Sequence, residues 1–244
     1  MTKVAFPKEH GAYVVLIASW LIGVIVGGWS EPIVSVTLLF IALVVFIAEH
    51  SLRQYVKTLT AIPVALFIVI LAASIVGGIV VIQHQKMVPF VLLGIGVTVS
   101  YIIVLQQRSP TIHRTYIGFS GLTLLAPLAA SLSDQQNTTE LAELWIMMTL
   151  LYLASAATVN IRLTAGKIKL PAYIMNALVV ISCILLVIFY HLTTALIVCA
   201  IISAVRFLAV LAWEDRYIRL RVKIVGIIES VVSLLFIVAF IVFR

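Results

Sequence analysis

The stretch Ala12–Trp29, AYVVLIASWLIGVIVGGW, is apolar at nearly every position. Lys223–Arg244 has the same character. A strand with one buried face would alternate polar and apolar residues, and neither segment does so. Within lipid, only bundled helices and closed barrels satisfy the backbone hydrogen bonds. The two segments therefore predict an all-α polytopic membrane protein.

The composition of the whole chain agrees with this prediction. Hydrophobic residues make up 64% of the sequence, charged residues make up 10%, and the mean hydropathy is +1.25. Soluble domains contain roughly 45–50% apolar and ~25% charged residues. Cys183 and Cys199 both lie in apolar segments, so we expect neither a disulfide framework nor a cysteine metal cluster. The chain is expected to be one transmembrane domain, residues 1–244.

Nine apolar runs can be marked along the chain, and we interpret each as a transmembrane span. One continuous helix over residues 172–213 would extend ~60 Å at 1.5 Å per residue, about twice the thickness of a bilayer core. We therefore expect this segment to fold back at His191–Thr194. The nine predicted spans are residues 12–29, 33–48, 61–82, 87–105, 116–132, 144–160, 172–190, 193–213 and 224–243.

The basic residues predict the orientation of these spans. With the N-terminus in the cytoplasm, thirteen of the sixteen Lys and Arg residues fall on the inner side, Lys86 and Arg244 fall outside, and Arg206 lies within a span. The positive-inside rule therefore places the N-terminus in the cytoplasm and the C-terminus outside. The net charge of +7 then belongs to one membrane face, so we expect membrane lipids and no nucleic acid as partners. The inner residues are Lys3, Lys8, Arg53, Lys57, Arg108, Arg114, Arg162, Lys167, Lys169, Arg216, Arg219, Arg221 and Lys223.

A Glu-His pair occurs at two span ends that face the cytoplasm. Glu9-His10 precedes the first span and Glu49-His50 follows the second, so an antiparallel helix pair would return both to one surface. Imidazole and carboxylate together can supply a base near neutral pH or bind a metal ion. We take these four residues as candidate catalytic groups, while an ordinary polar boundary is an equal alternative and the metal question stays open. Further candidate ligand-binding residues on this face are Lys8, Arg53, Arg108, His113 and Arg114.

A second group of polar residues is expected inside the membrane. Arg206 lies seven residues before the end of its span, and Glu229 lies six residues after the lysine that precedes the last span. At helical rise both sit roughly 9–11 Å below the inner boundary. A charge in hydrocarbon costs ~2.5–3.5 kcal/mol, so we expect the two residues to pair. The pair could join two helices, or it could line a polar cavity open to the cytoplasm, which Asn160 and Arg162 at a similar depth favour.

The short loops on the inner side are rich in arginine. Their sequences are QQRSPTIHR (Gln106–Arg114), NIRLTAGK (Asn160–Lys167) and EDRYIRLRVK (Glu214–Lys223). The forked guanidinium of arginine fits phosphate and carboxylate groups. Such loops also set membrane orientation and attract anionic lipids. The charge pattern therefore predicts an anionic partner, either a lipid headgroup or an anionic, isoprenoid-like small molecule.

Four further stretches are distinctive: FPKEHGAY (Phe6–Tyr13), YIGFSGLTLLAPLAA (Tyr116–Ala130), LYLASAATVNIRL (Leu151–Leu163) and RVKIVGIIES (Arg221–Ser230). Together they resemble the YwiC-like family of bacterial membrane proteins. PKEHGA is the most specific of these elements. The resemblance implies a multi-pass protein of the bacterial cytoplasmic (inner) membrane.

The architecture also resembles the UbiA superfamily of intramembrane prenyltransferases. Nine spans, an outside C-terminus and polar loops on the inner face are shared features. Members of that superfamily hold magnesium and a prenyl diphosphate with Asp-rich motifs after spans two and six. The corresponding segments here read EHSLRQ (Glu49–Gln54) and NIRLTAGK, so the Asp-rich motifs are missing and the cofactor is unknown.

Three functions are compatible with these observations. The first is a UbiA-like bundle whose cytoplasm-facing polar cavity binds an amphipathic or lipidic anionic ligand, as a divergent prenyl or lipid transferase that uses histidine as base and arginine in place of metal. The second is a proton-coupled transporter or carrier, because intramembrane ion pairs serve such proteins too. The third is an assembly factor for a membrane complex.

Overall fold

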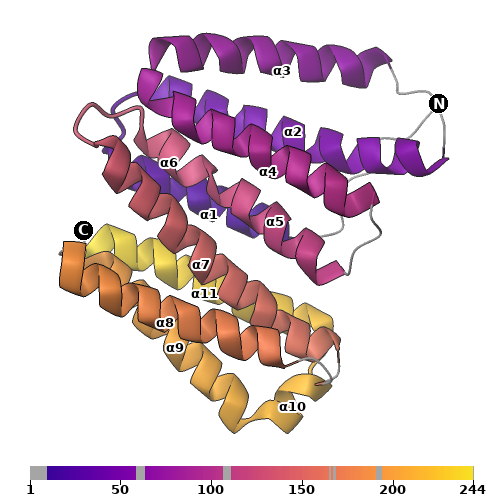
Figure 1. The fold of residues 1–244 in the computed structure, drawn as a ribbon, viewed down its shortest axis with the longest axis vertical. Coiled ribbons are helices and arrows are strands. Elements are labelled where there is room, and N and C mark those ends of the chain that lie inside the picture. The colour runs from indigo at the N-terminus through magenta and orange to yellow at the C-terminus, as the bar shows by residue number, and fades with distance from the viewer. Residues whose placement is uncertain are drawn as a thin grey trace.

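The computed structural model describes residues 10–58, 64–106, 111–164, 166, 169–190 and 194–243, and all regular structure within these ranges is helical (Figure 1). The elements are α1 (His10–Gly27), α2 (Pro32–Thr58), α3 (Val64–Gln83), η1 (Gln85–Met87), α4 (Val88–Gln106), α5 (Thr111–Thr123), α6 (Leu125–Ala130), α7 (Thr138–Leu163), α8 (Leu170–Tyr190), α9 (Thr194–Ala212), α10 (Glu214–Arg219) and α11 (Val222–Val242). The expected all-α fold is therefore confirmed for the described residues.

Most predicted spans correspond to one helix each. Most of the predicted turn at 191–194 lies outside the described residues, but α8 ends at Tyr190, α9 begins at Thr194, and the two helices pack against each other. The apolar part of α2, Pro32–Ile47, matches the second predicted span, whereas the helix itself continues to Thr58. The segment from Glu49 to Thr58 is polar but contains neither Pro nor Gly, so nothing in it stops a helix.

The fifth predicted span is broken into α5 and α6 at Leu124. Pro127 has no N–H to donate to the carbonyl of Thr123, and its ring would collide with that carbonyl in a continuous helix. The carbonyl of Ser120, next to the break, accepts hydrogen bonds from Nε1 of Trp145 at 3.1 Å and from the Thr123 hydroxyl at 3.0 Å. Side chains therefore satisfy the backbone where the helix is interrupted.

Three connections meet at one end of the bundle. Nζ of Lys86 donates to the backbone carbonyls of Asp134 and Gln136 at 2.9 and 3.0 Å, and Nε2 of His84 lies 3.3 Å from Oε2 of Glu31. These residues belong to the α1–α2, α3–α4 and α6–α7 connections. The helices that they join therefore run in alternating directions, as predicted for successive spans.

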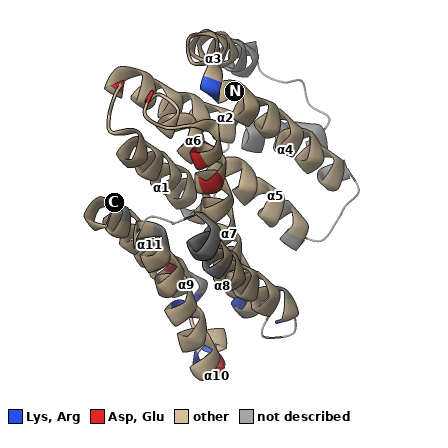
Figure 2. Cartoon of the chain, turned by 60° about the vertical axis from the view of Figure 1, so that its left-hand side comes forward, with Lys and Arg blue, Asp and Glu red and all other residues tan. Residues whose placement is uncertain are grey.

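The α7–α8 connection and α10 meet at the opposite end. Lys169 and Glu214 form an ion pair there, and Nε of Arg162 donates to the backbone carbonyl of Leu220. Figure 2 shows most of the Lys and Arg residues drawn in blue near α10, whereas the C-terminal end of α11 lies at the other end of the bundle (Figure 1). Among the described residues, basic side chains are thus concentrated at the α10 end.

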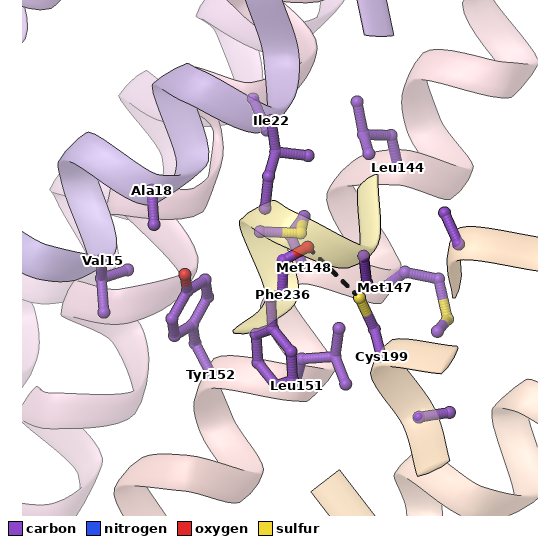
Figure 3. Close-up of a cluster of buried hydrophobic side chains, with 14 of the residues drawn as sticks. Val15, Ala18, Ile22, Leu144, Met147, Met148, Leu151, Tyr152, Cys199 and Phe236 are labelled. Carbon is purple, nitrogen blue, oxygen red and sulfur yellow. Dashed lines mark hydrogen bonds between the residues drawn. The ribbon is translucent and has the colours of Figure 1, made fainter. Parts of the chain in front are cut away.

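Helix α1 forms the centre of the bundle and packs against α6, α11, α5 and α2. Its approach to α6 depends on Gly23, where an added Cβ would collide with the carbonyl oxygen of Ala126 and lie 2.9 Å from the Cβ of Ala129. On the α7 side, Figure 3 shows Tyr152 and Phe236 within the apolar cluster, with ring centroids 6.2 Å apart in an edge-to-face contact. This packing places α7, α9 and α11 around one another.

The outer surface is apolar. Within the described ranges, two helical segments, Gln85–Val104 and Thr138–Leu163, are long and apolar enough to cross a membrane, and seven shorter apolar helical segments accompany them. Large apolar side chains such as Ile33 and Ile82 are mostly exposed. Soluble monomers rarely expose apolar surface over so many helices, so the architecture indicates a membrane protein.

Candidate functional site

The best-defined polar group inside the helical bundle is an ion pair between α9 and α11. Nη1 of Arg206 donates to Oε2 of Glu229 at 2.7 Å, and both side chains are largely buried. Arg206 lies six residues before the end of α9 and Glu229 seven residues after the start of α11, so two antiparallel helices bring them to one level. The pairing that we expected from their matched depth is confirmed.

Helices α7 and α8 complete the environment of this pair. Nη2 of Arg206 donates to the hydroxyl of Thr158 at 3.3 Å and to Oδ1 of Asn176 at 3.5 Å. The hydroxyl of Ser155 donates to Oε2 of Glu229. The Arg206 guanidinium and the Glu229 carboxylate thus connect α7, α8, α9 and α11. We call Arg206, Glu229, Thr158, Asn176 and Ser155 the polar cluster.

The polar cluster leaves several buried polar atoms unsatisfied. Nε of Arg206, Oε1 of Glu229 and the hydroxyl of Tyr217 on α10 have no hydrogen-bond partner among the described residues. Buried polar groups are nearly always hydrogen-bonded to protein or to ordered water. Unsatisfied atoms from α9, α10 and α11 therefore indicate that the polar cluster can accept a further polar group.

Tyr217 on α10 lies near enough to the polar cluster for the charges of Glu229 and Arg206 to act on its phenol. Its side chain is buried, and burial, reinforced by the negative charge of Glu229, raises the pKa of its phenol, whereas Arg206 and Arg162 act in the opposite direction. The phenol therefore stays neutral at physiological pH. It can donate a hydrogen bond without adding a charge to the polar cluster.

A hollow of about 430 Å³ opens beside α10 at the same end. It is lined by Lys169 and residues 211–216. A hydrogen bond to Glu214 raises the pKa of Lys169, so this lysine is a permanent cation there. The connection before it bends at Gly166, whose φ of +76° favours glycine. The lining of the hollow contains two cations, Lys169 and Arg216, and two carboxylates, Glu214 and Asp215, so its charges balance without a bound anion.

The predicted catalytic residues lie largely outside the described part of the chain. Glu9 precedes it, and the side chains of His10, Glu49 and His50 are not described although their backbones belong to α1 and α2. One turn from His10 and from His50, the rings of Tyr13 and Phe46 meet with centroids 5.1 Å apart. The two helices are therefore in contact at this level, while the catalytic role stays a prediction.

The remaining predicted ligand-binding residues fall into three groups. His113 is exposed on the first turn of α5, whereas Asn160 and Arg162 are half-buried near the end of α7. Arg162 is held by the Leu220 carbonyl, at the end of the bundle that contains Tyr217. Lys8 and Arg108 lie outside the described residues, and the side chains of Arg53 and Arg114 are not described.

Three members of the site were not predicted as ligand-binding residues: Ser155, Thr158 and Tyr217. Ser155, Thr158 and Arg162 are spaced i, i+3 and i+7 along α7, which places them on one face of a helix. This spacing could have identified the two hydroxyls. Tyr217 lies within EDRYIR (Glu214–Arg219), which contains four charged residues and resembles a loop, so its burial depends on packing that the sequence does not reveal.

No metal centre is evident in the described part of the chain, where no group of three or more His, Cys, Asp or Glu side chains could hold an ion. The question of a metal at His10 and His50 stays open, because these side chains lie outside that part.

Comparison with known proteins gives one match. A family model described as YwiC-like protein matches residues 6–130, which are 125 of the 244 residues. This segment includes FPKEHGAY and YIGFSGLTLLAPLAA and reaches from α1 to the end of α6. No curated protein and no solved structure matches the chain. The polar cluster therefore lies beyond the matched segment.

Proposed function

The chain belongs to the YwiC-like family, and we propose that it is a multi-pass membrane protein. It binds the anionic group of an amphipathic ligand at Arg206. The anionic group is of the phosphate type, as in a phospholipid or an isoprenoid phosphate. It enters from the end of the bundle that carries α10. Its apolar tail remains among the helices or in the surrounding lipid.

The observation that carries this proposal is the incomplete pairing of the buried charges. A guanidinium can hold an oxyanion through two parallel N–H groups, yet Arg206 contacts Glu229 through Nη1 alone and its Nε is unsatisfied among the described atoms. A buried ion pair is costly unless its remaining donors and acceptors are also satisfied. If the pair served only to join two helices, complete hydrogen bonding or replacement by apolar residues would make the protein more stable.

The proposed topology has nine membrane spans, with the N-terminus in the cytoplasm and the C-terminus outside the bacterial inner membrane. The distribution of basic residues supports this orientation. The alternating directions of the described helices support successive crossings. In this orientation the α10 end, with Lys169 and Arg216, faces the cytoplasm, and the ligand approaches from the inner leaflet.

A proton-coupled carrier is the second candidate, and the burial of two opposite charges between α9 and α11 favours it. Intramembrane charges commonly mark transport pathways. Accumulation of an anionic amphiphile in sealed vesicles, lost in Glu229→Gln, would support the carrier over a protein that only binds.

A UbiA-like transferase is a narrower version of the first proposal. It requires Glu9, His10, Glu49 and His50 to reach the same ligand as Arg206. The packing of α1 against both α2 and α11 supports such proximity. Turnover of a labelled isoprenoid diphosphate by the purified protein, reduced in His50→Gln, would support this chemistry, and absence of turnover would refute it.

The binding proposal is tested with two synthetic phosphate esters. Dihexyl phosphate carries one negative charge, whereas trihexyl phosphate has the same core and no charge. Binding to the purified protein in nanodiscs of zwitterionic lipid is measured by calorimetry. We expect the diester to bind and the triester not to bind. Arg206→Gln should weaken diester binding about tenfold or more, because hydrogen bonds to charged groups contribute ~1.5–3 kcal/mol.

Arg216→Gln is the matched control, since Arg216 is exposed on α10 at the same end of the bundle. This variant loses the same charge without touching the polar cluster, so its affinity should match the wild type. Equal binding of diester and triester, or an equal loss in both variants, would refute specific recognition at Arg206.

A further inference from the structure

We infer that binding of an anion at Arg206 is accompanied by uptake of one proton on Glu229, so that the polar cluster couples anion binding to protonation. This inference rests on the proposed function and specifies how the same site is regulated. It follows from the number of charges in the polar cluster and from the unequal use of the two oxygens of the Glu229 carboxylate.

The charges of the polar cluster balance only in the ligand-free state. Arg206 supplies one positive charge and Glu229 one negative charge, and both side chains are largely buried. An incoming anion would place two negative charges against one guanidinium. Like charges in a poorly solvated site disfavour simultaneous ionisation. Protonation of Glu229 restores the balance.

The two carboxylate oxygens of Glu229 have different environments. Oε2 accepts hydrogen bonds from Arg206 and from Ser155. Oε1 is buried and has no partner among the described atoms. A carboxylate is an acceptor only, but a protonated carboxyl also has one O–H donor. When a proton from the solvent at the α10 end binds Oε1 of Glu229, the new O–H can donate to the bound anion, and the unsatisfied Nε–H of Arg206 can donate to it as well.

The neighbouring titratable groups leave Glu229 as the group that changes charge. Arg206 on α9 stays protonated, and the phenol of Tyr217 on α10 stays neutral because burial raises its pKa. Arg162 on α7 is also permanently charged and donates to the Leu220 carbonyl. Tyr13 of α1 and Tyr152 of α7 are engaged with the rings of Phe46 and Phe236.

The positive charge of Arg162 could neutralise the bound anion in place of a proton on Glu229. Its positive charge acts on Tyr217 together with the charges of Arg206 and Glu229. If Arg162 moved to the bound anion, no proton would be needed. It is half-buried at the end of α7, however, and its Nε is occupied by the Leu220 carbonyl. The two possibilities predict opposite pH dependences.

The test measures proton uptake directly. Dihexyl phosphate is titrated into the wild-type protein in nanodiscs, in two buffers that differ in ionisation enthalpy, and the difference in heat gives the number of protons taken up. The charge of this diester does not change across neutral pH. We expect close to one proton per anion where Glu229 is ionised in the free protein, and a dissociation constant that weakens about tenfold per pH unit there.

Glu229→Gln and Asp215→Asn are the matched variants. In Glu229→Gln the neutral amide replaces the protonated carboxyl, so binding should be independent of pH and at least as tight as in the wild type at low pH. Asp215 is exposed on α10, and Asp215→Asn should retain full proton uptake. If Glu229→Gln does not fold, the two-buffer measurement on the wild type decides alone.

Two results would overturn the inference while leaving the proposed function intact: binding without proton uptake, and uptake that persists unchanged in Glu229→Gln. Loss of binding on Arg162→Gln together with zero uptake in the wild type would assign the balancing charge to Arg162. No binding of dihexyl phosphate at any pH would refute the proposed function and, with it, this inference.

Discussion

Removal of Glu229 alone should destabilise the protein much more than joint removal of Glu229 and Arg206. In Glu229→Leu, the guanidinium of Arg206 stays buried and keeps only the hydroxyl of Thr158 and the amide oxygen of Asn176, at 3.3 and 3.5 Å. Breaking a buried ion pair by removing one partner costs ~3–5 kcal/mol. We expect a loss in this range for the single variant.

The double variant Arg206→Leu/Glu229→Leu should recover most of that loss. Asn176 would still donate to the Thr158 hydroxyl at 3.2 Å and to the Ala172 carbonyl at 2.8 Å. The groups that lose a partner, the Asn176 amide oxygen and the Ser155 hydroxyl, are neutral, so the double variant leaves no buried charge unpaired. Replacing a buried ion pair by apolar residues is often neutral or stabilising by 1–4 kcal/mol. The two substitutions should therefore be strongly non-additive.

The assay is equilibrium unfolding in mixed detergent micelles, with wild type, both single variants, the double variant and Asp215→Asn as the surface control. Asp215→Asn should have the stability of the wild type. A loss of less than about 1 kcal/mol in Glu229→Leu, the value typical of an exposed ion pair, would refute the buried pairing. Additive losses in the double variant would refute it equally.

Further predictions concern the helix packing and the buried phenol. Gly23→Leu should cost about 1–3 kcal/mol or more because its side chain collides with the backbone of α6, whereas Gly77→Ala on α3 has open space and should be neutral or stabilising in the same unfolding assay. Trp145→Phe should cost about 1 kcal/mol through loss of its hydrogen bond to a backbone carbonyl beside the α5–α6 break, and a cost near zero would contradict that role. Because burial raises the pKa of Tyr217, its contribution to stability should be complete below the ordinary tyrosine pKa of ~10 and decline as pH rises beyond it. Tyr217→Phe should remove that decline in an alkaline unfolding series.

The sequence predicted the helices well where the physical signal is local. Long apolar runs predicted the central parts of the helices. The thickness of a bilayer predicted that residues 172–213 form two helices, now α8 and α9, and not one. The apolar run located only the apolar part of α2, and the extension to Thr58 lies in a polar segment that can remain helical because it has neither Pro nor Gly. The break at Leu124 was missed, since Pro127 was treated as part of one span.

The candidate site was predictable only in part. Matched depth on antiparallel helices predicted the pairing of Arg206 with Glu229, because two charges in an apolar setting have few other partners. Ser155 and Thr158 were not predicted, because hydroxyls in apolar helices often bond to their own backbone, as Thr158 also does to the Ala154 carbonyl at 2.8 Å. Tyr217 was not predicted, because its burial depends on how α10 packs at the end of the bundle.

A structure determined by cryo-electron microscopy with dihexyl phosphate bound would show whether an anion binds beside Arg206. We predict density for the phosphate group in contact with the Arg206 guanidinium, within hydrogen-bonding distance of Glu229 or Tyr217. Phosphate density confined to the hollow beside Lys169 and Arg216, with the Arg206–Glu229 contact unchanged, would contradict anion binding at Arg206.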